Sequence, residues 1–168
     1  MQLAIKGINV TIPDAEVSRL VLERLQGTAP AVAASVSSTL KPPRIGGAWP
    51  EQGGFYAGVV AGEVAGLDRD YHLIIGRDLD PASHGDQIAA SKACTDCDFT
   101  DWDLPYRKEQ RIQFCNAQSL FKAESYWSKE THASGSSDAW NQVFGSGSQL
   151  DWDKLTELRG RLVRRLSI

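Results

Sequence analysis

The stretch Asp101-Trp102-Asp103-Leu104-Pro105-Tyr106-Arg107 decides how the second half of this chain is interpreted. From Pro105 to Phe121, apolar residues recur at helical spacing, which predicts an amphipathic helix. Residues 126–131, 139–144 and 161–166 are rich in aromatic and β-branched residues, and turns rich in Gly and Ser separate them. The stretch therefore leads into one helix and then into the strands of an antiparallel sheet.

The chain before this stretch predicts two further strands and a second helix. Residues 55–60 and 71–75 are β-branched and aromatic, and Gly66-Leu67-Asp68 lies between them as a turn, so we expect a hairpin. Apolar residues at helical spacing support a helix from Pro81 to Ala93. Two helices beside an irregular antiparallel sheet make an α+β fold.

Short motifs follow one another in a fixed order through the second half of the chain. They are Trp-x-Leu-Pro at 102–105, Tyr-Trp-Ser at 126–128, Ala-Trp at 139–140, Phe-x-x-Gly at 144–147 and Val-Arg-Arg at 163–165. This order resembles the Lcl-C-like family of bacterial and phage proteins, which is named after the C-terminal domain of a collagen-like adhesin. The resemblance covers residues 44–168 and implies a C-type-lectin-like fold, similar to that of the variable proteins of diversity-generating retroelements.

The resemblance also implies a phage or prophage protein that binds a ligand and has no chemistry of its own. We expect the ligand to be a host protein or glycan, bound for receptor recognition or adhesion. A second hypothesis is an intracellular inhibitor that binds a host defence protein, because the small size and the formal charge of -3 fit that role equally well. Diversified members carry many variable polar positions near the C-terminus, whereas residues 154–165 form an ordinary charged strand, so active diversification is not expected.

Residues 1–26 predict an arm that is separate from a binding domain at 44–168, with residues 27–43 as a flexible linker. Apolar residues mostly alternate from Leu3 to Ile12, which fits a hairpin or a bent strand with its turn between Lys6 and Asn9. The linker is rich in Ala, Ser, Thr, Pro and Val and has no stable period.

Between Asp14 and Gly27 the arm carries the pattern of a short helix. Its apolar stripe consists of Val17, Leu20, Val21 and Leu25. So short a helix is marginal in water by itself, and the stripe therefore packs either on the binding domain or on other copies of the chain. Both alternatives stay open. For self-association, family analogy favours a homotrimer first and a dimer second.

Length and composition exclude several classes of protein. A chain of 168 residues with 42% hydrophobic and 23% charged residues has the values of a globular protein. The formal charge of -3 gives no overall attraction to nucleic acid or to an anionic membrane, and no apolar run approaches the roughly 18 residues of a membrane span. Three cysteines, an odd number, argue against a secreted disulfide framework. We expect a soluble protein made in the host cytoplasm, with packaging into a virion left open.

No set of residues points to catalysis, to a metal or to a cofactor, and we expect none of these. Cys94 and Cys97 have the spacing of a metal-binding or redox pair, but no second pair accompanies them. An enzyme of the formylglycine-generating type, which shares the broader fold, would need these cysteines or a bound metal. The Asp-Trp-Asp triplets at 101–103 and 151–153 offer few carboxylates for calcium, so we expect their aspartates at a helix start and in a turn.

Basic residues gather near the C-terminus, from Arg159 to Arg165, and such a cluster could attract nucleic acid or a glycosaminoglycan. Strand alternation explains the pattern more simply. Leu162 and Leu166, or Val163, would face inward while the arginines cover an exposed strand edge. We therefore do not expect nucleic acid as a partner.

The large aromatic residues of the predicted strands divide into core and surface. We expect Tyr126, Trp140 and Phe144 to be buried. Residues 129–137 and 145–151 are polar, with many small side chains and a few charged ones, and antibody binding sites use such mixtures. The predicted ligand-binding residues are Trp127, Lys129, His132, Gln149 and Asp151.

Overall fold

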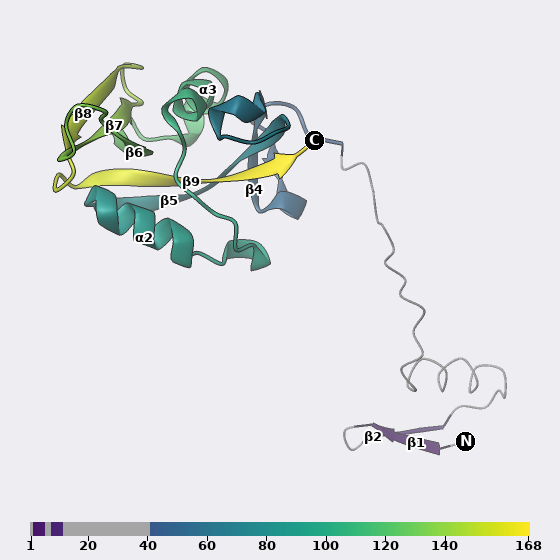
Figure 1. The fold of residues 1–168 in the computed structure, drawn as a ribbon. Helices are drawn as coiled ribbons and strands as arrows, with labels where there is room; N and C mark the ends of the chain where they lie inside the picture. The colour runs from purple at the N-terminus through teal and green to yellow at the C-terminus, as the bar shows by residue number, and fades with distance from the viewer. Residues whose placement is uncertain (1, 6–7, 12–40) are drawn as a thin grey trace. The chain divides into compact units, whose positions relative to one another are not determined.

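The computed structural model describes residues 2–5, 8–11 and 41–168 of the chain (Figure 1). Contacts divide the chain into two compact units, Met1–Lys41 and Pro42–Ile168. In the first unit, strands β1 (Gln2–Ile5) and β2 (Ile8–Thr11) pair antiparallel, so of the two expected alternatives the hairpin is the one formed. The predicted helix with its stripe lies outside the described residues, as does most of the predicted linker; the stripe residues are Val17, Leu20, Val21 and Leu25.

The second unit is built on one mixed sheet of seven strands in the order β3-β4-β5-β9-β6-β7-β8. The strands are β3 (Ala48–Trp49), β4 (Gly54–Val60), β5 (Tyr71–Ala82), β6 (Ser125–Thr131), β7 (Asp138–Val143), β8 (Gln149–Asp153) and β9 (Leu158–Ser167). Neighbouring strands are antiparallel, except that β6 pairs with β9 in parallel. Helix α2 (His84–Ala93) lies on one face of the sheet and helix α3 (Arg107–Ala117) on the other (Figure 1). The predicted α+β class is confirmed.

Helix α3 is unusual in that its inner face is polar. Glu109, Gln110 and Gln113 are fully buried against the sheet, whereas Ile112 and Phe114, which predicted the helix, are only half-buried. Buried polar groups need hydrogen-bond partners, and such partners constrain a helix more narrowly than apolar contacts do. The sheet therefore has to offer matching polar groups beneath α3.

Strand β9 lies in the middle of the sheet, between β5 and β6, and supplies Arg165 to Glu109, while the Tyr126 carbonyl of β6 accepts from Gln110. The other arginines of β9 are buried by contacts elsewhere. Arg159, Arg161 and Arg164 are all buried. Arg159, for example, binds Asp78 at 2.9 Å and Glu124 at 2.8 Å. The prediction that the C-terminal arginines cover an exposed strand edge is therefore wrong, since the edge strands are β3 and β8.

The first and last motifs of the family resemblance meet at the start of α3. Asp103 and Val163 exchange backbone hydrogen bonds of 3.0 and 2.9 Å. Arg164 forms an ion pair with Asp101, and Arg165 forms one with Asp103. Asp101 and Asp103 are thus bound by arginines, and the two motifs join α3 to the central strand of the sheet.

The burial of Trp127 and Trp140 is the reverse of what the sequence predicts. Trp127 is fully buried beside Leu104 and Ala139, and its Nε1 donates to the carbonyl of Ala82 at 3.2 Å. Trp140 is only half-buried, contrary to the prediction. The reason is the alternation of β7, in which Ala139 points to the core beside Trp127, so that Trp140 points to the other face of the sheet. Tyr126 and Phe144 are buried, as predicted.

Candidate ligand-binding face

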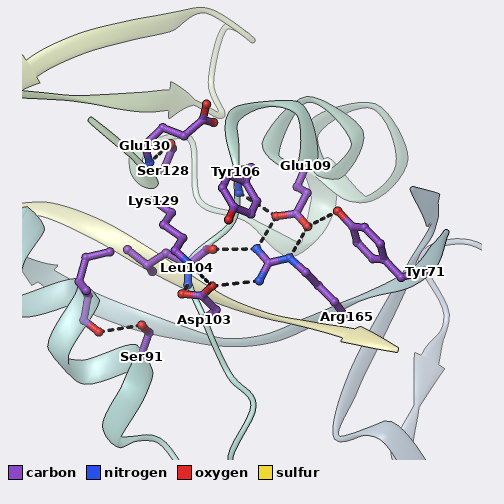
Figure 2. Close-up of polar contacts among 11 residues, drawn as sticks. Tyr71, Ser91, Asp103, Leu104, Tyr106, Glu109, Ser128, Lys129, Glu130 and Arg165 are labelled. Atoms are coloured by element: carbon purple, nitrogen blue, oxygen red, sulfur yellow. Dashed lines mark hydrogen bonds and ion pairs between the residues drawn. The ribbon is translucent and has the colours of Figure 1, made fainter. Parts of the chain in front are cut away.

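An ionic network lies between α3 and the sheet (Figure 2). The two carboxylate oxygens of the fully buried Glu109 accept hydrogen bonds from Arg165 of β9, each at 2.8 Å. The Tyr71 hydroxyl and the backbone N–H of Tyr106 donate to the same carboxylate, each at 2.7 Å. A buried ion pair is stable only where good geometry and further hydrogen bonds compensate its desolvation, and this pair has both. The network therefore fixes the first turn of α3 to the sheet.

The network reaches the surface through Asp103 and Lys129. Asp103 accepts a hydrogen bond from Arg165 Nη1 at 3.0 Å and also binds the Lys129 ammonium group. Lys129 and Arg165 both lie over the ring of Tyr106, at 5.4 and 4.9 Å from its centroid. Lys129, a predicted ligand-binding residue, thus neutralises Asp103, while its side chain stays 35% exposed.

Tyr71 and Arg165 both keep their protons near neutral pH. Burial and the adjacent Glu109 raise the pKa of the Tyr71 hydroxyl, which therefore stays protonated and donates. Burial lowers the pKa of Arg165, but the hydrogen bonds and charges of Glu109 and Asp103 outweigh that effect and raise the pKa. Proton transfer needs a group whose pKa lies near the working pH. Tyr71 and Arg165 are therefore suited to stabilising the packing of α3 on the sheet.

A second group of side chains gathers around Trp140, where α3 begins. The guanidinium carbon of Arg107 lies 3.4 Å from the centroid of the Trp140 ring, and the ring of His132 lies 5.0 Å from it. An arginine in this position is attracted by the negative face of the indole. The Gln149 amide donates to the carbonyl of Arg107 at 2.8 Å, which ties β8 to α3.

Strand pairing places Asp151 beside Trp140, since the two residues are directly opposite each other in β8 and β7. The bonds from Val143 N–H to Ser148 O and from Lys154 N–H to Ser137 O set the alternation of the ladder. By this alternation Trp140 and Asp151 form a non-hydrogen-bonded pair, the type in which side chains are closer. The group formed by Arg107, His132, Trp140, Gln149 and Asp151 is called the Trp140 face below.

Three of the five predicted ligand-binding residues lie on this face: His132, Gln149 and Asp151. Trp127 does not, because it is fully buried in the core; the prediction that it contacts the ligand is corrected by that burial. Lys129 lies with Asp103 in the ionic network instead. The segment expected to be a loop at 145–151 is also partly a strand, since β8 begins at Gln149.

Sequence reasoning missed Arg107 and Trp140 as members of the face. For Trp140 a signal was present, because only one of the adjacent Ala139 and Trp140 can point to the core from a strand. For Arg107 no local signal exists, since its stack on Trp140 joins a helix start to a distant strand. Its backbone N–H is held by the Glu130 carboxylate at 2.6 Å, again through a contact between distant segments.

Cys94 and Cys97 have the spacing of a metal-binding or redox pair, and the structure describes both. In the described part of the chain, no three His, Cys, Asp or Glu side chains are grouped so that they could hold a metal ion. Cys94 is buried beside Trp102 and Leu162, and burial raises the pKa of its thiol. Cys97 is exposed, and both thiols are free.

No protein-family model matches the sequence, and no curated protein is similar enough to count as a relative. None of the helices within the described ranges is long and apolar enough to cross a membrane. The Trp140 face and the ionic network next to it are therefore the basis for assigning a function.

Proposed function

We propose that this chain is a non-catalytic phage or prophage binding protein that presents the Trp140 face to a host protein or glycan. The observation that carries the proposal is the half-exposed stack of Arg107 on Trp140. Trp and Arg are among the residue types that contribute most to binding at interfaces. A stack that exists before binding also loses little side-chain freedom when the ligand arrives.

The polar groups of the face are available to a ligand. Among the described residues, the Arg107 guanidinium forms no ion pair. The exposed Asp151, which lies opposite Trp140 in the ladder, offers acceptors on the same face. A ligand that carries both acceptors and donors, such as a hydroxyl-rich glycan or a polar protein surface, matches this pair.

The surroundings of the face also favour recognition. Residues 133–137 and 145–148 consist almost entirely of Gly, Ser and Ala and flank the face on two turns. Small polar residues beside rigid aromatic ones give adaptable hydrogen bonding next to a fixed contact area. Functional residues are commonly carried by such loops where a rigid scaffold positions them. Here the network of Glu109 and Arg165 supplies the rigid support.

The C-type-lectin-like fold and membership of the Lcl-C-like family are part of the same proposal. They are supported by the order of the motifs and by two helices on opposite faces of a mixed sheet. The phage origin and synthesis in the host cytoplasm rest on the same resemblance. Detection of the protein in purified virions would favour receptor recognition, whereas its absence from them would favour an intracellular inhibitor.

Capture of host components by the immobilised full-length chain tests the binding role. Solubilised host envelope and host cytosol are applied separately to the wild type, to Arg107→Ala/Asp151→Ala, and to the control Glu63→Ala/Arg69→Ala. The control residues are exposed and lie between β4 and β5, far from β7 and β8 in the strand order.

We expect the face variant to bind the captured component at least about tenfold more weakly, and the control to bind like the wild type. Capture from the envelope supports receptor recognition, and capture from the cytosol supports the inhibitor. Equal capture by the face variant and the wild type contradicts the proposal.

A further inference from the structure

Strand β8 is an open edge of the sheet. It is the last strand in the order, and within the described ranges it pairs only with β7. By the alternation of the ladder, the backbone N–H and C=O groups of Gln149 and Asp151 and the N–H of Asp153 point away from β7. The other edge, β3, has only two residues. An edge of five residues with free backbone groups is a template to which another strand can add.

One face of this edge is apolar. Leu150 and Trp152 point to the same side of β8 and are 40% and 39% exposed, and Leu155 in the following turn is 84% exposed. When a peptide adds to a sheet edge, backbone hydrogen bonds supply affinity and alternate side chains supply selectivity. The exposed Leu and Trp side chains would therefore select apolar residues at every second position of an added strand.

The other face of the edge is acidic. Asp151 and Asp153 alternate with the apolar residues, and Asp153 lies directly opposite Asp138 of β7 in a non-hydrogen-bonded pair. Like charges opposed in this way destabilise a sheet. None of the three carboxylates forms an ion pair with a Lys or Arg in the described part of the chain. The adjacent Lys154 instead donates to the carbonyl of Ser136.

We infer that β8 binds an extended cationic segment of a partner protein, which adds to the sheet as a further strand and alternates Lys or Arg with apolar residues. Its cations would relieve the repulsion between Asp138 and Asp153, and its apolar side chains would cover Leu150 and Trp152. A second copy of this chain fits poorly, because antiparallel pairing of two β8 strands brings the aspartates of both copies together. The inference goes beyond the proposed function, since the edge can bind such a segment whether or not the Trp140 face binds a ligand.

Three blocked hexapeptides test the inference on the full-length chain. The first alternates Lys and Val, the second replaces Lys by Glu, and the third keeps the first sequence but carries N-methyl groups that remove its backbone donors. We expect the Lys peptide to bind at least about tenfold more tightly than either of the others. It should also slow hydrogen exchange at the amides of Gln149, Asp151 and Asp153.

Charge variants of the chain test whether the Lys peptide binds at β8. Asp138→Asn/Asp153→Asn should weaken the Lys peptide by about tenfold without unfolding the protein, because the change removes a repulsion. Glu63→Gln/Asp68→Asn removes the same charge from the connection between β4 and β5 and should leave binding unchanged.

Equal binding of the Lys and Glu peptides, no effect of N-methylation, or exchange protection away from β8 would overturn the inference. Protection of the β8 amides in the free chain, together with a concentration-dependent mass of two chains, would overturn it in favour of a second copy.

Discussion

The interior beneath α3 holds charged residues where many domains have aliphatic ones. Glu109 is fully buried, and it is matched by Arg165, Tyr71 and the N–H of Tyr106. Removal of either Glu109 or Arg165 takes away the main charged partner of the other buried group, which destabilises the folded state. The same dependence makes the network a rigid support for the nearby Trp140 face.

Glu109→Gln tests the dependence of Arg165 on its partner. The substitution keeps the size of the side chain but leaves the guanidinium without this carboxylate, and we expect the free energy of unfolding to fall by about 3–5 kcal/mol. Urea denaturation measures the change. Lys129→Met, which removes a half-exposed partner of Asp103, is the control and should cost at most about 1 kcal/mol. If both substitutions lower the free energy of unfolding equally, the buried Glu109–Arg165 pair contributes no more to stability than the half-exposed Lys129.

At the scale of elements, β5 accommodates the Trp102 ring because it has a glycine at the contact. A Cβ added at Gly76 would lie 2.4 Å from that ring, which is almost fully buried. Trp102 is also held by a hydrogen bond from its Nε1 to the carbonyl of Asp96 at 3.1 Å. The segment before α3 can therefore lie against the sheet only while residue 76 has no side chain.

Gly76→Ala should lower the free energy of unfolding by about 1–3 kcal/mol, because the added methyl group overpacks the contact with Trp102. Gly85→Ala in α2 is the matched control. A Cβ at Gly85 meets nothing within 4 Å, so the same change should stabilise the protein by about 0.4–1 kcal/mol through the unfolded state. Thermal unfolding of both variants ranks their stabilities. A Gly76→Ala variant that is more stable than Gly85→Ala would contradict the tight contact between residue 76 and Trp102.

Local patterns predicted most elements, but the order of the strands lay beyond them. Alternation and turn residues located β4, β5, β6, β7 and β9, and apolar residues at helical spacing located both helices. Strand β8 was missed because Gln149-Leu150-Asp151-Trp152-Asp153 is polar enough to be taken for a loop, although it alternates. The central position of β9 depends on pairing with distant segments, which no local pattern contains. For that reason the sequence did not predict that the arginines of β9 are buried. It did not predict the stack of Arg107 on Trp140 either.

At the scale of the whole molecule, we propose that the N-terminal arm assembles several copies of the chain. Weak sites that act together bind with an avidity greater than any one of them achieves. The full-length chain should therefore have the mass of three chains in light scattering, with two as the second choice. Leu20→Glu/Val21→Glu should reduce it to the mass of one, because charges disrupt the apolar stripe, whereas Glu16→Gln/Glu23→Gln should not. A wild type with the mass of one chain would contradict the proposal.

Hydroxyl-radical footprinting of the wild-type chain, with and without the captured partner, tests the role of the Trp140 face most directly. Hydroxyl radicals oxidise exposed aromatic, imidazole and aliphatic side chains, and a bound partner shields those that it covers. We predict that the partner protects Trp140 and His132 and leaves the oxidation of Val59, which is exposed on β4, unchanged. Protection confined to Trp152 would assign the partner to the β8 edge. Unchanged oxidation of Trp140 and His132 in the complex would contradict the claim that this face is the binding site.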